Sequence, residues 1–127
     1  MPTVLIVDDS IAIRTLTSHM LTALNVESVL AEDGQQALEM CKAAMPDGVL
    51  LDWNMPVMDG PMFQQRLRAL PGGKKPKIIF CTIEDTYEKI AKAISGEAEG
   101  FIIKPFTLGT LAYNLERAGI IEKKSPA

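Results

Sequence analysis

Several features that would assign a protein to a common functional class are absent from this 127-residue sequence. Its only two cysteines, Cys41 and Cys81, lack metal-ligand spacing, which argues against a cysteine metal site and favours reduced core residues. No apolar run is long enough to span a bilayer and no signal peptide is present, so we expect a cytoplasmic protein without a membrane partner. The formal net charge of -3 argues against direct binding of nucleic acid, which needs a basic face.

The sequence also lacks internal repeats. A second domain is not expected, because the length suits one hydrophobic core. We predict a single domain over residues 1–121, followed by a polar tail over residues 122–127.

Four apolar runs end on reactive polar residues. The runs and the residues that follow them are Val4–Val7 before Asp8 and Asp9, Gly48–Leu51 before Asp52, Ile78–Cys81 before Thr82, and Gly100–Ile103 before Lys104 and Pro105. A buried parallel strand delivers a polar side chain in this way to the carboxyl edge of a sheet, where open α/β folds keep their sites.

Strands and helices are predicted to alternate along the chain. Strands are expected at Thr3–Val7, Glu27–Ala31, Gly48–Leu51, Lys77–Thr82 and Glu99–Ile103, and helices after Ser10, after Asp33 and Gly34, from Pro61, over Glu84–Ser95 and after Thr107. Right-handed crossovers then give an α/β fold, a flavodoxin-like doubly wound five-stranded parallel sheet of order 2-1-3-4-5 with five helices. The first and third strands would lie side by side and bring Asp8, Asp9 and Asp52 together.

Helical spacing of apolar residues predicts which helix faces are buried. The expected inward residues are Ile13, Leu16, Met20 and Leu24 in the first helix, Ala37, Leu38 and Cys41 in the second, Phe63, Leu67 and Leu70 in the third, and Leu108, Leu111, Ala112 and Leu115 in the last. Trp53 is predicted to be half-exposed and His19 to lie on the surface.

The predicted cluster of three carboxylates calls for a cation, because two unit charges ~4 Å apart repel by roughly 4 kcal/mol at an effective dielectric constant near 20. Oxygen ligands without histidine or cysteine select a hard ion such as Mg²⁺. Lys104 and Thr82 would add an ammonium and a hydroxyl, which together suit phosphoryl transfer to Asp52 as the nucleophile. Taken alone, the acid pair is also typical of a helix cap, and a Lys-Pro step of a turn.

Four motifs carry a resemblance to a known family. They are VDDS at Val7–Ser10, LLDWNMPVMDG at Leu50–Gly60, FCTIED around Thr82, and FIIKPF at Phe101–Phe106. With them the sequence resembles the receiver domains of response regulators, specifically the CheY-like single-domain type, over roughly Pro2 to Gly119.

The resemblance implies a role for each matching residue. Asp52 is expected to accept a phosphoryl group, with Mg²⁺ held by the side chains of Asp9 and Asp52, by the backbone carbonyl of Asn54 and, through water, by Asp8. Thr82 and Lys104 are expected to contact the phosphoryl oxygens and to have catalytic roles. The Lys104–Pro105 bond is expected to be cis.

The resemblance also implies a two-component signalling protein. Its donor would be a histidine kinase or a histidine phosphotransfer protein, and its output a changed contact with a downstream target protein or a phosphorylation-dependent dimer. That contact would use the helix over Glu84–Ser95, the fifth strand and the last helix, with Thr82 and Phe101 as switch residues and Tyr87 and Ile90 on the surface. No enzymatic activity is expected beyond the protein's own phosphorylation and slow dephosphorylation.

Two residues depart from the family pattern. Ile83, after Thr82, stands where a small residue is usual and could narrow access to Asp52. The ring at the switch position is Phe101 and not tyrosine, so coupling to Thr82 would depend on ring volume alone.

Two other classes compete with this interpretation. Aspartate-nucleophile phosphohydrolases place a second aspartate two residues after the nucleophile, and Asn54 at that place cannot transfer a proton. A flavodoxin-like cofactor binder needs a phosphate-cradling loop after the first strand, where Asp8 and Asp9 would repel the phosphate.

Overall fold

The structure, a computed structural model of the whole chain, describes residues 1–83, 91 and 98–122. In order, its elements are β1 (Thr3–Val7), α1 (Ile11–Ala23), β2 (Glu27–Ala31), α2 (Gly34–Ala43), β3 (Gly48–Asp52), α3 (Gly60–Arg68), β4 (Lys77–Thr82), β5 (Gly100–Ile103) and α5 (Leu108–Arg117). Five strands and four of the five predicted helices are therefore confirmed in this part of the chain. The helix predicted for Glu84–Ser95 lies almost wholly outside the described residues.

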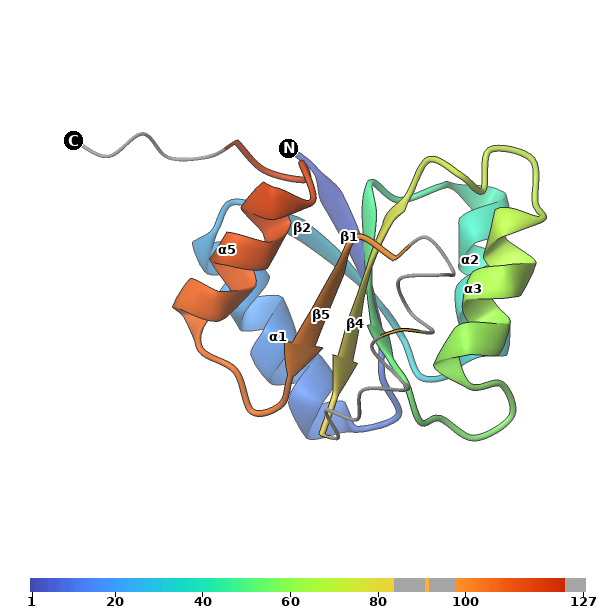
Figure 1. Cartoon of the computed structure of the whole chain (residues 1–127), viewed down its shortest axis with the longest axis horizontal. Helices are drawn as coiled ribbons and strands as arrows, with labels where there is room; N and C mark the ends of the chain where they lie inside the picture. The colour runs from blue at the N-terminus through green and yellow to red at the C-terminus, as the bar shows by residue number, and fades with distance from the viewer. Residues whose placement is uncertain (84–90, 92–97, 123–127) are drawn as a thin grey trace.

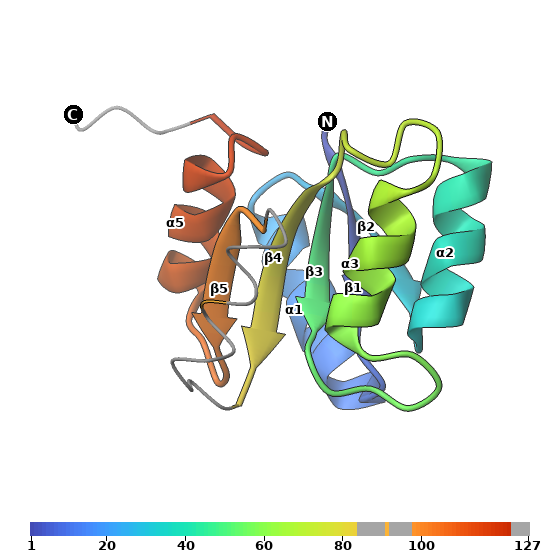
Figure 2. The ribbon, with the colours of Figure 1, turned by 45° about the vertical axis from the view of Figure 1, so that its right-hand side comes forward.

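The strands form one parallel sheet of order β2-β1-β3-β4-β5, which confirms the predicted topology. Figure 2 shows β5 at one edge, with β4 and β3 beside it. In register, Val7 pairs with Leu51, and Leu51 pairs with Phe80. Residues that follow β1, β3 and β4 therefore leave the sheet at the same edge, the carboxyl edge.

Helices cover both faces of the sheet, with α1 and α5 on one side and α2 and α3 on the other (Figure 1). Each face carries its own buried cluster. The cluster under α2 and α3 includes Leu5, Leu51, Phe63 and Phe80, and the cluster under α1 and α5 includes Ile6, Leu21, Ile79 and Leu111. All five residues of β3 are buried, as expected for a central strand covered on both faces.

Each of the four helices given above begins at a side chain that accepts a hydrogen bond from the backbone three residues later, which satisfies a donor that the helix itself leaves unpaired. These caps are Ser10, Asp33, Asp59 and Thr107. The caps explain why the helices begin where they do, directly after the loops that leave the strands.

The predicted helix faces are confirmed for α2 and α3 but partly wrong for α1 and α5. Leu16 is 55% exposed, and the fully buried positions of α1 are Thr17 and Leu21. Leu108 is 41% exposed, whereas Leu111 and Leu115 are buried. The buried face of α1 was misassigned because it includes a threonine, which a search for regularly spaced apolar residues does not count.

The opposite, amino edge of the sheet is held by Arg68. Its guanidinium donates hydrogen bonds to the carbonyls of Gly73 (3.0 Å) and Pro76 (2.7 Å) and lies 3.6 Å from the Glu99 carboxylate. The same carboxylate accepts a hydrogen bond of 2.6 Å from the backbone of Ile78. These contacts tie the end of α3 to the beginnings of β4 and β5, far from the carboxyl edge.

None of the helices in the described part of the chain combines the length and the apolar character that crossing a bilayer requires.

Gly60, the first residue of α3, packs directly against the end of β3. A Cβ atom there would lie 2.7 Å from the Asp52 carbonyl oxygen and 2.8 Å from the Phe80 ring, both too close. We expect Gly60→Ala to lower the free energy of unfolding by about 1–3 kcal/mol, because crowding in a packed site forces backbone shifts. Urea denaturation measures this loss.

Gly109 in α5 offers a matched control, because its added Cβ would meet only the Thr107 hydroxyl at 3.7 Å. Gly109→Ala should leave the stability unchanged or raise it by up to about 1 kcal/mol through helix propensity. Equal stability of the two variants would show that Gly60 is not packed as described.

Candidate functional site

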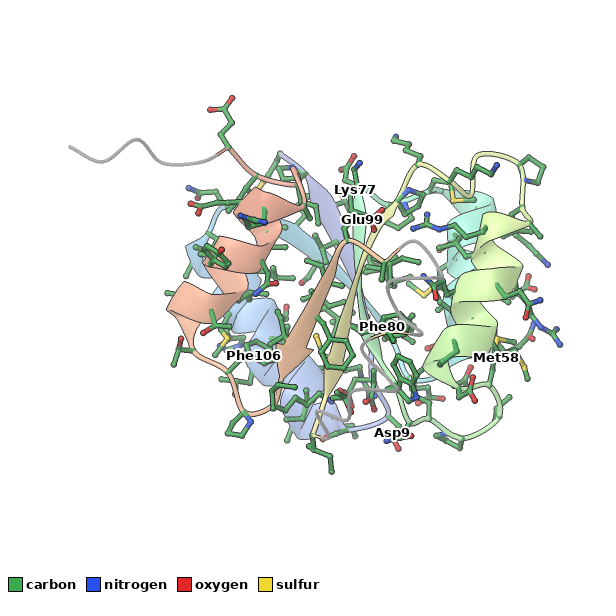
Figure 3. All side chains as sticks on the ribbon, in the orientation of Figure 1. Asp9, Met58, Lys77, Phe80, Glu99 and Phe106 are labelled. Atoms are coloured by element: carbon green, nitrogen blue, oxygen red, sulfur yellow. The ribbon has the colours of Figure 1, made fainter. Side chains whose placement is uncertain are left out.

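Three carboxylates meet at the carboxyl edge of the sheet. Asp8 and Asp9 follow β1, Asp52 ends β3, and one oxygen from each lies within 4.8 Å of the others. Asp8 and Asp52 are buried and Asp9 is exposed. Figure 3 shows Asp9 at this edge, at the end of the sheet opposite Lys77 and Glu99. The predicted convergence of the three acids is therefore confirmed.

Lys104 brings a positive charge to these acids from the residue after β5. Its Nζ atom donates to Asp8 Oδ2 at 2.5 Å and lies 3.4 Å from Asp52 Oδ1. The three side chains are each about a tenth exposed or less. The ammonium therefore bridges two carboxylates and lies nearer to Asp8 than to Asp52. The Lys104–Pro105 bond is cis, as predicted.

Asp8 is also fixed by local hydrogen bonds. Its Oδ1 atom accepts from the backbone of Ser10 at 2.9 Å, and its carbonyl accepts from Arg14 at 2.6 Å. Ser10 in turn caps α1 by accepting from Ile13. The cap of α1 is therefore Ser10 and not the acid pair of the alternative interpretation; Asp8 holds the backbone of this cap and also belongs to the charged cluster.

Burial changes the protonation of the charged groups. It raises the pKa of the Asp52 carboxyl to about 6; the charge of Lys104 opposes this shift, and the charges of Asp8 and Asp9 add to it. For Lys104, burial lowers the pKa, but the hydrogen bond to Asp8 and the charges of Asp52 and Asp8 outweigh it and leave the pKa above its ordinary value. Asp52 therefore sits where its negative charge is poorly stabilised and Lys104 where its positive charge is well stabilised.

A cleft of about 430 Å³ opens above these residues. It is lined by the three acids and Lys104 together with Ser10, Ile13, Asn54, Ile83 and Pro105. Asn54 is exposed, and Ile83 is 73% exposed at the rim. Ile83 therefore stands beside the entrance to Asp52, where the sequence placed it.

Thr82 ends β4 at the level of the acids and is almost fully buried. Its carbonyl accepts a hydrogen bond of 2.7 Å from the backbone of Lys104, which joins the ends of β4 and β5. Phe101 lies half-buried on β5. Tyr87 and Ile90, predicted for the partner surface, lie outside the described residues.

The donor set fits a hard divalent cation. All three candidate side-chain ligands are carboxylates, and one ammonium leaves the cluster with an excess of negative charge. Burial, together with the charges of Asp8 and Asp9, holds the pKa of Asp52 above its ordinary value although Lys104 opposes the shift, so a further positive charge would stabilise the ionised carboxylate. Magnesium prefers one or two carboxylates plus water, and the exposed Asp9 and the open cleft allow for water.

Trp53 is the site residue that the sequence placed wrongly. It is only 7% exposed, and its ring packs on the rings of Phe80 and Phe101. The position of Phe80 one strand away, on the same face of the sheet, is the signal that could have predicted this burial.

The loop after Asn54 contains a strained residue that no sequence pattern predicted. Val57 has a φ of 70° and is 79% exposed, and Met58 donates to the Pro56 carbonyl across it at 2.7 Å. A positive φ is a genuine outlier for a β-branched residue. The loop beside Asp52 is therefore a tight turn held at a conformational cost.

Comparisons with known proteins agree with this arrangement. Residues 4–116 match the family model described as the response regulator receiver domain. The chain is 36% identical to the chemotaxis protein CheY-3 of Vibrio cholerae over 90% of this chain and 88% of that protein. It is 37% identical to the chemotaxis protein CheY1 of Helicobacter pylori over 88% of this chain and 92% of that protein.

Solved structures give the same result. The chemotaxis protein CheY4 of Vibrio cholerae superposes with a TM-score of 0.88 at 38% identity, covering 93% of this chain and 98% of that one. The receiver domain of the sensor histidine kinase PA1611 of Pseudomonas aeruginosa superposes with a TM-score of 0.84 at 27% identity, over 93% and 98% of the two chains. That structure has a magnesium ion coordinated in its active site cleft.

The raised pKa of Asp52 predicts how stability depends on pH. The pKa in the folded protein, about 6, lies above the ordinary value of 3.8, so the folded state binds this proton more tightly than the unfolded state does. The stabilisation is fully present below the ordinary value and is lost as the pH rises through about 6. In Mg²⁺-free buffer, wild type should therefore gain free energy of unfolding relative to Asp52→Asn as the pH falls from 7.5 to 5, measured by urea denaturation. A difference that stays constant over this range would contradict the raised pKa.

Proposed function

This chain belongs to the response regulator receiver family of two-component signalling, and we propose that it accepts a phosphoryl group on Asp52 and signals through changed binding to another protein. The observation that carries this proposal is a buried carboxylate with an ammonium at 3.4 Å and two further acids beside it, at the floor of an open cleft.

The proposed reaction is transfer from a phosphohistidine. An oxygen of Asp52 forms a bond to phosphorus while the N–P bond of the donor breaks, and its electron pair stays on the imidazole, which takes up a proton. Asp52 must be ionised to attack, and it is largely so above the pKa of about 6. Lys104 would then move from Asp8 toward a phosphoryl oxygen, and the Thr82 hydroxyl would donate to another.

The residues fit Mg²⁺ as the cofactor, as the donor set indicated. Asp9 and Asp52 would hold it with the backbone carbonyl of Asn54, and Asp8 through water. When bound, the ion would offset the negative charge of the acids and of the phosphoryl oxygens. Without it, Lys104 is the one described cation paired with Asp52.

A protein donor, a histidine kinase or a histidine phosphotransfer protein, fits the surroundings of the cleft. Ile11, Val57 and Ile83 follow β1, β3 and β4, and each is more than 70% exposed. Exposed apolar side chains gathered at one edge of a domain usually mark a contact with another protein. We therefore expect transfer from a kinase to be faster than from a small acyl phosphate, because Ile83 stands at the entrance to Asp52.

We do not expect the protein to hydrolyse other phosphate esters. Asn54 lies in the cleft at the place where a phosphohydrolase would carry its general acid and base, and an amide does not transfer protons at neutral pH. The protein would thus catalyse only its own phosphorylation and a slow loss of the phosphoryl group.

Phosphorylation at Asp52 is tested by incubation with a phosphorylated histidine kinase and Mg²⁺. Intact-protein mass spectrometry should show one added phosphoryl group that is stable in acid and labile in base. Asp52→Asn should show none, and removal of Mg²⁺ with a chelator should slow labelling at least tenfold, since the acids alone repel the donor. Labelling of Asp52→Asn at the wild-type rate would move the acceptor elsewhere.

The proposed output surface includes β5 and α5. Ile103, Leu108 and Tyr113 are exposed there, and the Arg117 guanidinium lies 5.8 Å from the centre of the Tyr113 ring. Lys104 connects this surface to the site, because it directly follows Ile103 and reaches Asp52. A downstream target protein or a second copy of the chain would bind this surface when Asp52 is phosphorylated.

Hydrogen–deuterium exchange can locate this surface without a known partner. With Mg²⁺ and beryllofluoride, a phosphoryl mimic, amide exchange should change in residues 100–118 and remain unchanged in β2, at the other edge of the sheet. Asp52→Asn should show no change in amide exchange in residues 100–118. Changes concentrated in β2 and α2 would place the output on the opposite side of the molecule.

A further inference from the structure

Three aromatic rings connect the phosphoacceptor position, at the end of β3, to β5, an edge strand of the sheet. Trp53 follows Asp52 at the end of β3, Phe80 lies on β4, and Phe101 lies on β5. The centre of the Trp53 ring is 4.8 Å from that of Phe80 and 6.3 Å from that of Phe101, with interplanar angles of 51° and 58°. These tilted arrangements lie within the range of favourable aromatic contacts.

The backbone register explains how the rings meet. Phe80 and Phe101 are direct partners in the β4–β5 pairing, so their side chains leave the sheet on the same face. Figure 3 shows Phe80 on the side of the sheet that faces α3, whereas Phe106 lies on the opposite side. Trp53 reaches across from β3 and contacts both rings.

The Asp52 end of this chain of rings is held rigidly. Phe80 is fully buried, and the carbonyl of Trp53 accepts a hydrogen bond of 2.9 Å from the backbone of Gly60. A Cβ atom on Gly60 would lie 2.8 Å from the Phe80 ring and 3.1 Å from the Trp53 Cα, so only glycine allows this approach. These contacts restrain the backbone of Trp53, and a shift of that backbone would also move Asp52, its covalent neighbour.

Phe101 forms the other end, where there is more freedom. It is half-buried, on an edge strand, and packs against the cluster that contains Trp53 and Phe80. Phenylalanine has no hydroxyl group, so its ring position depends on packing alone.

We propose that Trp53 is a positioning residue that couples the state of Asp52 to the ring position of Phe101. This inference rests on the proposed function and adds a second route from the site to β5, separate from the Thr82 hydroxyl. A displacement of the backbone at residues 52–53 changes the space that the Trp53 ring leaves for Phe101. By reciprocity, a change at Phe101 alters the affinity of the site for a phosphoryl mimic.

A double-mutant cycle tests the coupling. The affinity for beryllofluoride in the presence of Mg²⁺ is measured by isothermal titration calorimetry for wild type, Trp53→Leu, Phe101→Leu and the double variant. If the rings are coupled, the double variant should differ from the product of the two single effects by about threefold to tenfold, the size of a typical aromatic pair interaction. Trp53→Phe, which keeps a ring and a folded core, should retain part of this coupling.

Two controls separate the coupling from a general loss of packing. Phe63→Leu removes a fully buried ring from the same cluster and should lower stability while leaving the beryllofluoride affinity unchanged. A parallel cycle of Thr82→Ala with Phe101→Leu measures the hydroxyl route. Coupling in that cycle alone would assign the switch to Thr82 and overturn the role of Trp53.

The remaining outcomes separate this inference from the proposed function. If wild type binds beryllofluoride and the double variant shows simply the product of the two single effects on affinity, the coupling is overturned and the proposed function remains intact. An equal effect of Phe63→Leu on affinity would also overturn it. A folded wild-type protein that does not bind beryllofluoride at all would overturn the proposed function and the coupling together.

Discussion

The ion pairs of Lys104 with Asp8 and Asp52 join the ends of β1, β3 and β5, and the geometry of the site depends on them. All three side chains are largely removed from water, where an unpaired charge is strongly unfavourable. Removing one partner of a buried pair typically costs about 3–5 kcal/mol, because the other charge is left uncompensated. The pairs therefore fix Lys104, which follows an edge strand, over the acids of two central strands.

The same pairs leave the site short of positive charge. One ammonium is shared between two buried carboxylates, and Asp9 adds a third negative charge at the rim. Burial is the main cause of the raised pKa of Asp52, and the charges of Asp8 and Asp9 add to it while that of Lys104 opposes it. Such a charge balance fits a divalent cation, and Lys104 has two carboxylate partners, of which Asp8 is the nearer.

Much of this arrangement could be predicted from the sequence, because each strand end joins two strong signals. A buried apolar run that stops at Asp52 or at Lys104 gives both a strand and the residue that it delivers to the carboxyl edge. The register of the strands could not be predicted from the sequence. The prediction that the site residues converge did not need it, since parallel strands all end at the same edge of the sheet. The motifs then identified the family, and the comparisons confirmed it.

The wrong predictions have a common physical cause, which is that burial depends on neighbours from other elements. Thr17 is buried in place of Leu16 because the packing of α1 on the sheet, and not its apolar spacing, sets the phase of the helix. Trp53 was expected to be half-exposed because a loop position next to an acidic residue is usually exposed to solvent. Phe80, from another strand, provides the surface that buries it. The positive φ of Val57 could not be predicted, since a β-branched residue is the least expected one in that conformation.

The two edges of the sheet differ in a way that bears on how a signal could travel. At the amino edge, Arg68 and Glu99 hold α3, β4 and β5 with hydrogen bonds between side chain and backbone, at the opposite end of the strands from Asp52. At the carboxyl edge, a backbone hydrogen bond joins the ends of β4 and β5, and contacts between side chains are added to it: the Lys104 ammonium pairs with Asp52, and the Trp53 ring packs near Phe101. A change in the charge of Asp52 would therefore act first on the carboxyl edge, where these side-chain contacts lie. Phe101 lies on β5 and Lys104 directly follows it, so the ion pair of Asp52 and the ring contact of its neighbour Trp53 converge on the same edge strand.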